Sequence, residues 1–102
     1  MTTTFNLSKS NRPEKKYSVQ FINPTTERLN IIHFGAKNYE DYTIHKDNIR
    51  KERYLNRHSK REDWNNPQSA GFWSRWLLWN KPTLKQSIKD TNKKFGIKII
   101  LV

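Results

Sequence analysis

Basic side chains recur along one predicted helix at spacings that place them on a single face. We refer to these five residues as the basic stripe: Arg50, Arg53, Arg57, Lys60 and Arg61. In a helix they fall within an arc of roughly 100°. Four of the five are Arg, whose guanidinium group pairs with phosphate or carboxylate through two hydrogen bonds at once. The stripe therefore predicts contact with a polyanion, and a merely solvated helix face is the alternative for the same pattern.

A second candidate surface is aromatic. Residues 70–84 carry three of the four tryptophans of the chain. Wound as a helix, the segment gathers Phe72, Trp73, Trp76, Leu77 and Trp79 within roughly 160°, and leaves Ser74, Arg75 and Leu78 on the other side. A buried indole needs a hydrogen-bond partner for its N–H. We expect this helix to form part of the core, with docking onto a partner as the alternative, and Arg75 to join the residues that contact the polyanion.

The remaining residues that could do chemistry do not assemble into a catalytic or metal-binding pattern. His33, His45 and His58 are widely spaced, and His58 with Glu62 supplies only two ligands to a metal ion. The chain has no Cys, and its three glycines form no phosphate-binding loop. We therefore predict a protein that is not an enzyme and that holds neither a metal nor another cofactor.

Charge and composition narrow the class of partner. The 102 residues include 20 Lys and Arg against 9 Asp and Glu, which gives a net charge of +11 and favours nucleic acid or acidic protein surfaces. Only 33% of the residues are hydrophobic, but 13% are aromatic, so a thin core in one domain is expected. We find neither the apolar region of a signal peptide nor an apolar run of about 20 residues, and so predict no signal-peptide secretion and no membrane span.

The pattern of polar and apolar residues predicts an arm followed by one domain. Residues 1–15 are polar and contain Pro13, so we expect a flexible basic and polar arm, with the folded domain in residues 16–102. Alternation at 17–21 and the apolar run 29–34 predict a β-hairpin. Residues 36–44 lack a clear period and are expected to form a structured loop.

Capping residues divide the rest of the chain into three helices and a strand. Asp47 opens a helix that we expect to run to about Asp63, Ser69 opens the tryptophan helix, and Thr83 opens a helix that ends at Gly96. Residues 97–102 are β-branched and apolar, which predicts a final strand. The expected fold is α+β in the order ββαααβ, with a small antiparallel sheet, made by the N-terminal hairpin and the C-terminal strand, packed by three helices.

Several segments resemble a known group of proteins. They are residues 34–47, 50–54, Arg57-His58, Glu62-Asp63-Trp64 and residues 70–84. Over residues 31–96, the chain is similar to a family of small uncharacterised basic proteins encoded by large double-stranded DNA viruses of algae and protists. This resemblance implies a protein of the virion or of the infected host cell interior, but no activity or catalytic residue.

Two functions fit this context. The first is a non-enzymatic virion structural protein of minor-capsid type, which bridges acidic surfaces of viral coat proteins and packaged DNA. The alternative is a nucleic-acid-binding protein that places the basic stripe on the phosphate backbone.

Overall fold

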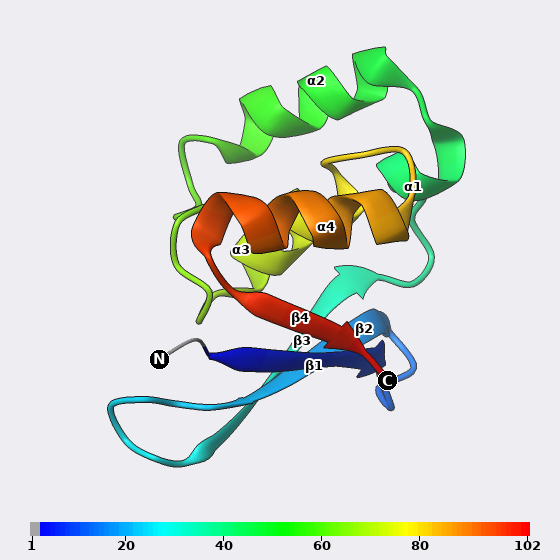
Figure 1. Ribbon diagram of the computed structural model, residues 1–102. Coiled ribbons are helices and arrows are strands. Elements are labelled where there is room, and N and C mark those ends of the chain that lie inside the picture. The colour runs from blue at the N-terminus through cyan, green and yellow to red at the C-terminus, as the bar shows by residue number, and fades with distance from the viewer. Residues whose placement is uncertain (1–2) are drawn as a thin grey trace.

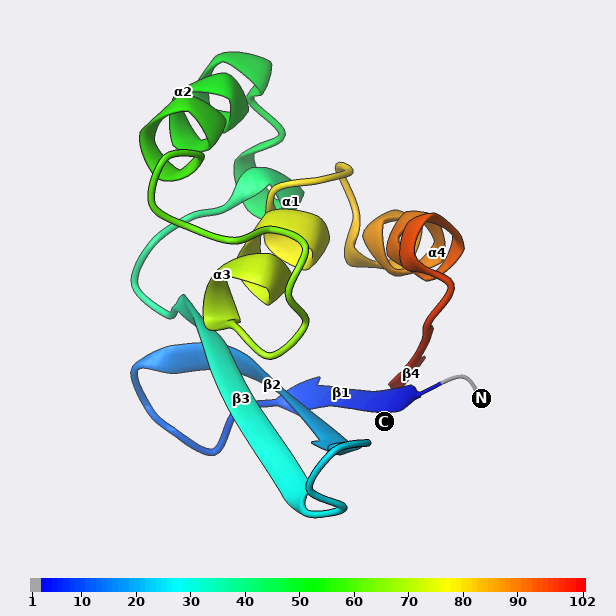
Figure 2. The ribbon, with the colours of Figure 1, turned by 90° about the vertical axis from the view of Figure 1, so that its left-hand side faces the viewer.

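A four-stranded sheet with helices on one face makes up the fold (Figure 1). The computed structural model describes residues 3–102. The strands are β1 (Thr4–Lys9), β2 (Lys15–Ile22), β3 (Leu29–Ala36) and β4 (Lys98–Leu101). They lie side by side in the order β3-β2-β1-β4, and β1 pairs with β4 in parallel while the other pairs are antiparallel. In the described part of the chain, the other face of the sheet carries no helix (Figure 2).

The helices begin where short polar side chains can cap them. They are α1 (Tyr42–His45), α2 (Asn48–His58), α3 (Ala70–Trp73) with its π-helical continuation η1 (Ser74–Leu78), and α4 (Leu84–Phe95). The predicted caps Asp47, Ser69 and Thr83 each accept a hydrogen bond from a backbone N–H of the first turn. Gly96 ends α4 in the left-handed conformation, with φ 62°, as expected.

The predicted flexible arm is wrong, because residues 4–9 form β1 in the middle of the sheet. Phe5 and Leu7 are 3% and 0% exposed and belong to the core. Asn6, between them, points to the open face of the sheet and is exposed. A strand with one solvated face needs an apolar residue only at alternate positions, so its mean composition looks like that of an arm. The domain therefore begins at β1, and residues 1–2 lie outside the described residues.

The α+β class and the β2–β3 hairpin are confirmed, but the sheet is mixed rather than antiparallel. The C-terminal strand pairs with β1 and not with the hairpin, and residues 3–102 form four strands where three were expected. Three further differences concern the helices. The expected loop 36–44 contains the start of α1, α2 ends at His58 rather than near Asp63, and the tryptophan helix is α-helical only over its first four residues.

The π-helical turn changes which side chains of the tryptophan segment reach the core. The N–H of Trp79 donates to the carbonyl of Ser74, five residues back, at 3.1 Å. The extra residue per turn rotates the end of the segment relative to an α-helix. Leu78, expected on the outer side, is therefore 2% exposed, whereas Trp76 and Trp79 are only partly buried. The predicted core role is confirmed for Phe72 and Trp73, both fully buried.

Candidate polyanion-binding cleft

A cleft of about 710 Å³ separates α2 from the end of the β2–β3 hairpin and from α3 and η1. We refer to it as the basic cleft, because five cationic side chains line it: Lys15, Lys16, Arg50, Arg53 and Arg57. The last three come from the predicted basic stripe, at helical spacing along α2. Lys15 and Lys16 come from β2, which forms the opposite wall. Two elements far apart in sequence thus direct cations into one recess.

Not all of the predicted polyanion-binding residues reach the basic cleft. Lys60 and Arg61 follow the end of α2 and are exposed outside it. Arg75 also lies elsewhere: its guanidinium carbon is 4.2 Å from the ring centroid of Trp76 and 5.4 Å from that of Trp64. It donates to the carbonyl of Trp79 at 3.1 Å. Burial lowers the pKa of Arg75, which fits a cation packed against indoles better than one offered to a partner.

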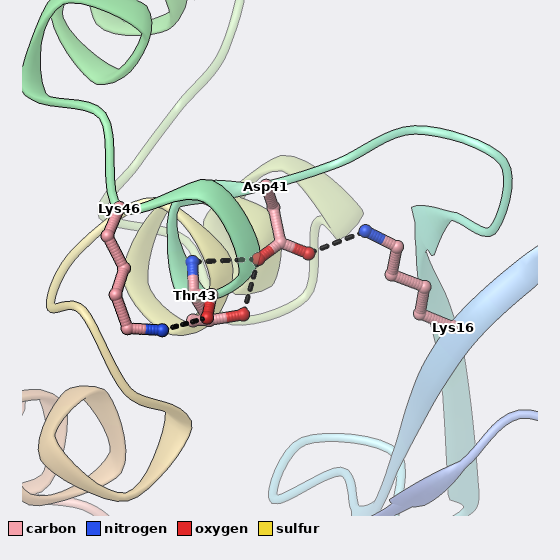
Figure 3. A network of polar contacts seen from close by, with 4 residues as sticks. All are labelled: Lys16, Asp41, Thr43 and Lys46. Atoms are coloured by element: carbon pink, nitrogen blue, oxygen red, sulfur yellow. Dashed lines mark hydrogen bonds and ion pairs between the residues drawn. The ribbon is translucent and has the colours of Figure 1, made fainter.

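Three carboxylates also line the basic cleft, and two of them are committed to local contacts. Asp41 is almost fully buried and accepts a 2.6 Å hydrogen bond from Lys16 Nζ (Figure 3). Asp41 also caps α1 through the N–H and hydroxyl of Thr43. Since Lys16 and Asp41 neutralise each other, this pair holds the start of α1 against β2 instead of attracting a ligand.

Glu62 is committed to the other end of the cleft. Its Oε1 lies 3.1 Å from His58 Nδ1 and accepts a long, 3.4 Å hydrogen bond from the indole of Trp64. A Cβ on Gly71 would come within 2.6 Å of Glu62 Oε2, so the glycine makes room for this carboxylate. Glu62 therefore packs against Trp64 and Gly71 at this end of the cleft.

Apart from Lys16, the cationic side chains of the basic cleft are available to pair with an anion. Arg50 lies 3.9 Å from Glu40, in an exposed contact that contributes little. Within residues 3–102, no carboxylate lies within 4.0 Å of a charged nitrogen of Lys15, Arg53 or Arg57. These three side chains can therefore pair with an anion from outside without first breaking an internal ion pair.

Aromatic rings form the wall between α2 and η1. The rings of Tyr54 and Trp79 stack at 4.3 Å with an angle of 3° between their planes, and His58 stacks on the other side of Tyr54 at 4.3 Å. Burial raises the pKa of the Tyr54 phenol, with Glu62 adding to the shift, so the phenol stays neutral. Trp79 is the one predicted aromatic residue among those lining the cleft in the described chain.

A polar network holds α2 in place over the cleft. Lys51 Nζ donates to the carbonyl of Asn80 at 2.6 Å and lies 4.8 Å from the ring centroid of Tyr42. Asn80 in turn donates to Asp90 on α4 at 2.8 Å. Burial and the nearby Arg75 lower the pKa of Lys51, while the hydrogen bond from Asn80 lowers that of Asp90. The position of the arginines therefore depends on contacts at the back of α2.

Lys15, Lys16 and Tyr39 were not among the predicted site residues. Tyr39 lines the basic cleft, yet 75% of its surface is exposed, which places it at the rim. Two adjacent lysines at the start of a strand carry no distinguishing pattern. The sequence marks Tyr39 only as an aromatic residue in a loop, between the polar residues Asn38 and Glu40.

Residues 3–102 contain no group of three or more His, Cys, Asp or Glu side chains that could hold a metal ion. Among the helices of these residues, none has the length and apolar character needed to cross a bilayer.

Comparison with known proteins gives one match. Residues 5–58 match the sequence profile of a family of unknown function, DUF5754, which covers more than half of the chain. The chain belongs to this family. No curated protein and no solved structure matches the chain. The matched DUF5754 region runs from β1 to the end of α2, so it includes all five cations of the basic cleft but not the tryptophan segment.

Proposed function

We propose that this protein binds single-stranded nucleic acid, without catalysis, by holding its phosphate backbone in the basic cleft. The observation that carries the proposal is the convergence of Arg50, Arg53 and Arg57 with Lys15 in one recess. Guanidinium groups pair with phosphate oxygens through two hydrogen bonds, and each neutralised phosphate releases counterions.

The spacing of the arginines suits a chain of phosphates better than a single anion. Arg50 and Arg57 are seven residues apart on α2, which corresponds to about 10 Å along the helix axis at 1.5 Å per residue. Lys15 faces them from β2. A polymer with regularly repeated charges can contact the whole row, whereas a small anion reaches only part of it.

The shape of the site favours a single strand over a duplex. The cations lie in a recess between a helix and a hairpin, and a flexible single strand can turn its phosphates into such a recess. The exposed ring of Tyr39 at the rim offers a surface on which an unpaired base can stack. Phosphate contacts and one stacking surface predict binding with little sequence preference.

The predicted minor-capsid role remains a second use of the same charges. An acidic segment of a coat protein also pairs with arginines, but it has no bases to stack on Tyr39 and no reason to prefer a recess. We therefore place nucleic acid first, and binding to an acidic polypeptide is the competing outcome.

The test measures binding of a fluorescent single strand, and of the matching duplex, by anisotropy at several salt concentrations. We expect the single strand to bind more tightly, and log K to fall by about 0.7 per neutralised phosphate for each unit of log salt. The double variant Arg53→Glu/Arg57→Glu should lose binding by at least about 100-fold, that is, about 2.7 kcal/mol. Tyr39→Ala should weaken it about tenfold, within the range for one base stack.

A matched control uses the two residues of the basic stripe that lie outside the cleft. Lys60→Glu/Arg61→Glu makes the same change in net charge, so it should weaken binding far less than the cleft variant. Equal losses in the two double variants would show that only overall charge matters and would contradict the cleft site. Binding to an acidic polypeptide such as polyglutamate that exceeds binding to the single strand would favour the coat-protein role.

A further inference from the structure

The two edges of the sheet differ in how their backbone groups are protected. At β4, two N–H groups that point away from β1 are already bonded, that of Ile99 in the strand and that of Ile97 just before it. Ile99 donates to Asn92 Oδ1 at 2.9 Å, and Ile97 donates to the carbonyl of Asn92 at 3.2 Å. The end of α4 therefore closes most of this edge, which is a common protection against pairing with another strand.

The β3 edge has no comparable protection. Two backbone hydrogen bonds show which residues form bonded pairs. The N–H of Asn23 donates to the carbonyl of Arg28 at the turn between β2 and β3, and the N–H of Ser10, just after β1, donates to the carbonyl of Lys16 on β2. Since bonded and non-bonded pairs alternate between antiparallel strands, the N–H and C=O groups of Leu29, Ile31 and His33 point away from β2. Within residues 3–102, no side chain or loop bonds to them.

Apolar side chains accompany these free backbone groups. Leu29 and Ile31 are 57% and 48% exposed on the open face of the sheet, next to Ile22 at 57%. β3 contains no Lys, Arg, Asp or Glu in its eight residues, although 28% of the whole chain is charged. Long, uncharged and apolar edge strands are those that pair with another chain.

We infer that the partner of this edge is a second copy of the same protein, joined through antiparallel β3–β3 pairing. Two molecules with a charge of +11 repel each other over most of their surface. β3 has no charged side chain that would add to this repulsion. The free backbone N–H and C=O groups of β3 are also complementary to the same groups of a second copy. A two-fold axis at Ile31 sets Ile31 opposite Ile31 of the second copy and Leu29 opposite His33, so every edge group finds a partner.

This pairing joins the two sheets into one of eight strands. The exposed residues Leu29 and Ile31 of both copies then form one apolar strip across the joint. The arginines of α2 lie outside the paired segment, so the inference does not depend on the proposed function of the basic cleft.

The test is the molar mass in solution, measured by light scattering and sedimentation. The wild-type protein should have twice the mass of one chain, and Ile31→Lys should have the mass of a single chain. Ile22→Lys is the matched control: it places the same charge on the same face, but one strand away from the edge. It should remain a dimer, and the thermal midpoint of both variants should show that they are folded.

Cross-linking gives a second readout that needs no change in charge. The chain has no Cys, so Ile31→Cys creates a single thiol. The thiols of the two copies would face each other, and a short bismaleimide should join them into a covalent dimer. With Gln20→Cys, the thiols would be three strand spacings apart, about 14 Å, and should not react with the same reagent.

The inference fails if the wild-type protein has the mass of one chain at every concentration, which would leave the edge to a strand of another protein. It also fails if Ile31→Lys remains a dimer, or if Gln20→Cys cross-links as well as Ile31→Cys, because the copies would then meet elsewhere.

Discussion

Single residues explain why the tryptophan segment can pack so closely on the hairpin. Gly35 lies in β3 with φ +80°, and a Cβ at this position would come within 2.8 Å of Leu78 Cδ1. Gly96 has a similar φ of +62°, but a Cβ there would have no neighbour within 4 Å. Both glycines therefore adopt a positive φ that other residues rarely adopt. Of these two positions, only Gly35 also lacks space for a Cβ.

Replacing Gly35 should be more destabilising than replacing Gly96. Gly96→Ala carries the cost of a left-handed backbone, about 1–2 kcal/mol. Gly35→Ala carries this cost and also displaces Leu78 from the core, for a total of about 3 kcal/mol. Denaturant unfolding of both variants measures the difference. Equal losses of stability would mean that Leu78 moves aside freely and that the contact with Gly35 is unimportant.

Asp90 should make the free energy of unfolding depend on pH in the acidic range. The hydrogen bond from Asn80 holds the folded-state pKa of Asp90 below its ordinary value of 3.8. A lowered folded pKa stabilises the protein above the unfolded pKa, and this contribution disappears as the pH falls through the folded pKa. The stability gap between wild type and Asp90→Asn should therefore be largest above about pH 4 and shrink below it. A gap that does not change between pH 6 and pH 2 would contradict this assignment.

At the scale of elements, α2 depends on a small number of contacts. It packs through Tyr54, which lies between His58 and Trp79, and it is bonded through Lys51 to Asn80. These three rings line the basic cleft together with the arginines of α2. The π-helical turn decides this arrangement, because it presents Trp79 to α2 while it turns Leu78 into the core.

Removing the indole of Trp79 should loosen α2 selectively. We expect Trp79→Ala to cost on the order of 2–3 kcal/mol, less than a fully buried Trp. Hydrogen exchange should show faster exchange in α2 than in the strands. Trp76→Ala is the control, because Trp76 packs against Phe95 of α4 and donates to the carbonyl of Trp64. It should destabilise the protein without singling out α2. Unchanged protection of α2 in Trp79→Ala would show that polar contacts, such as those of Lys51 with Asn80 and of Asn48 with Tyr42, hold the helix without this stack.

At the scale of the whole molecule, β1 joins the two ends of the chain. It pairs with β2 on one side and with β4 on the other, so among residues 3–102 the last strand has β1 as its only neighbour in the sheet. Phe5 contacts both Phe21 of β2 and Trp73 of α3, with centroid distances of 4.8 and 5.0 Å. The N-terminal segment is thus central to the core.

Deleting residues 1–9 should abolish cooperative unfolding. The deletion removes two buried side chains and the strand that holds β4, a loss of roughly 5 kcal/mol or more, comparable to the whole stability of a small domain. Circular dichroism during thermal unfolding measures it. Asn6→Ala, on the solvated face of the same strand, should change the midpoint little. A sharp transition after the deletion would restore the interpretation of this segment as an arm.

Local signals in the sequence determined much of the secondary structure. Asp47, Ser69 and Thr83 cap helices through hydrogen bonds to groups two or three residues away, and Gly96 ends α4 through its own backbone. The β2–β3 hairpin follows from the alternation at 17–21 and the apolar run 29–34 on either side of one turn. The helical spacing of Arg50, Arg53 and Arg57 likewise fixed their common face. Each of these features depends on neighbours within a few residues.

The tertiary structure decided the rest, because it depends on contacts between distant segments. The parallel pairing of β1 with β4 joins residues more than 90 positions apart. The π-helical turn is stabilised by Thr91, which donates to the carbonyl of Trp76, and Arg75 is drawn between two indoles. The basic cleft itself exists only where β2 faces α2. A sequence pattern carries the period of one element, but the burial of its side chains is set by the other elements that pack on it.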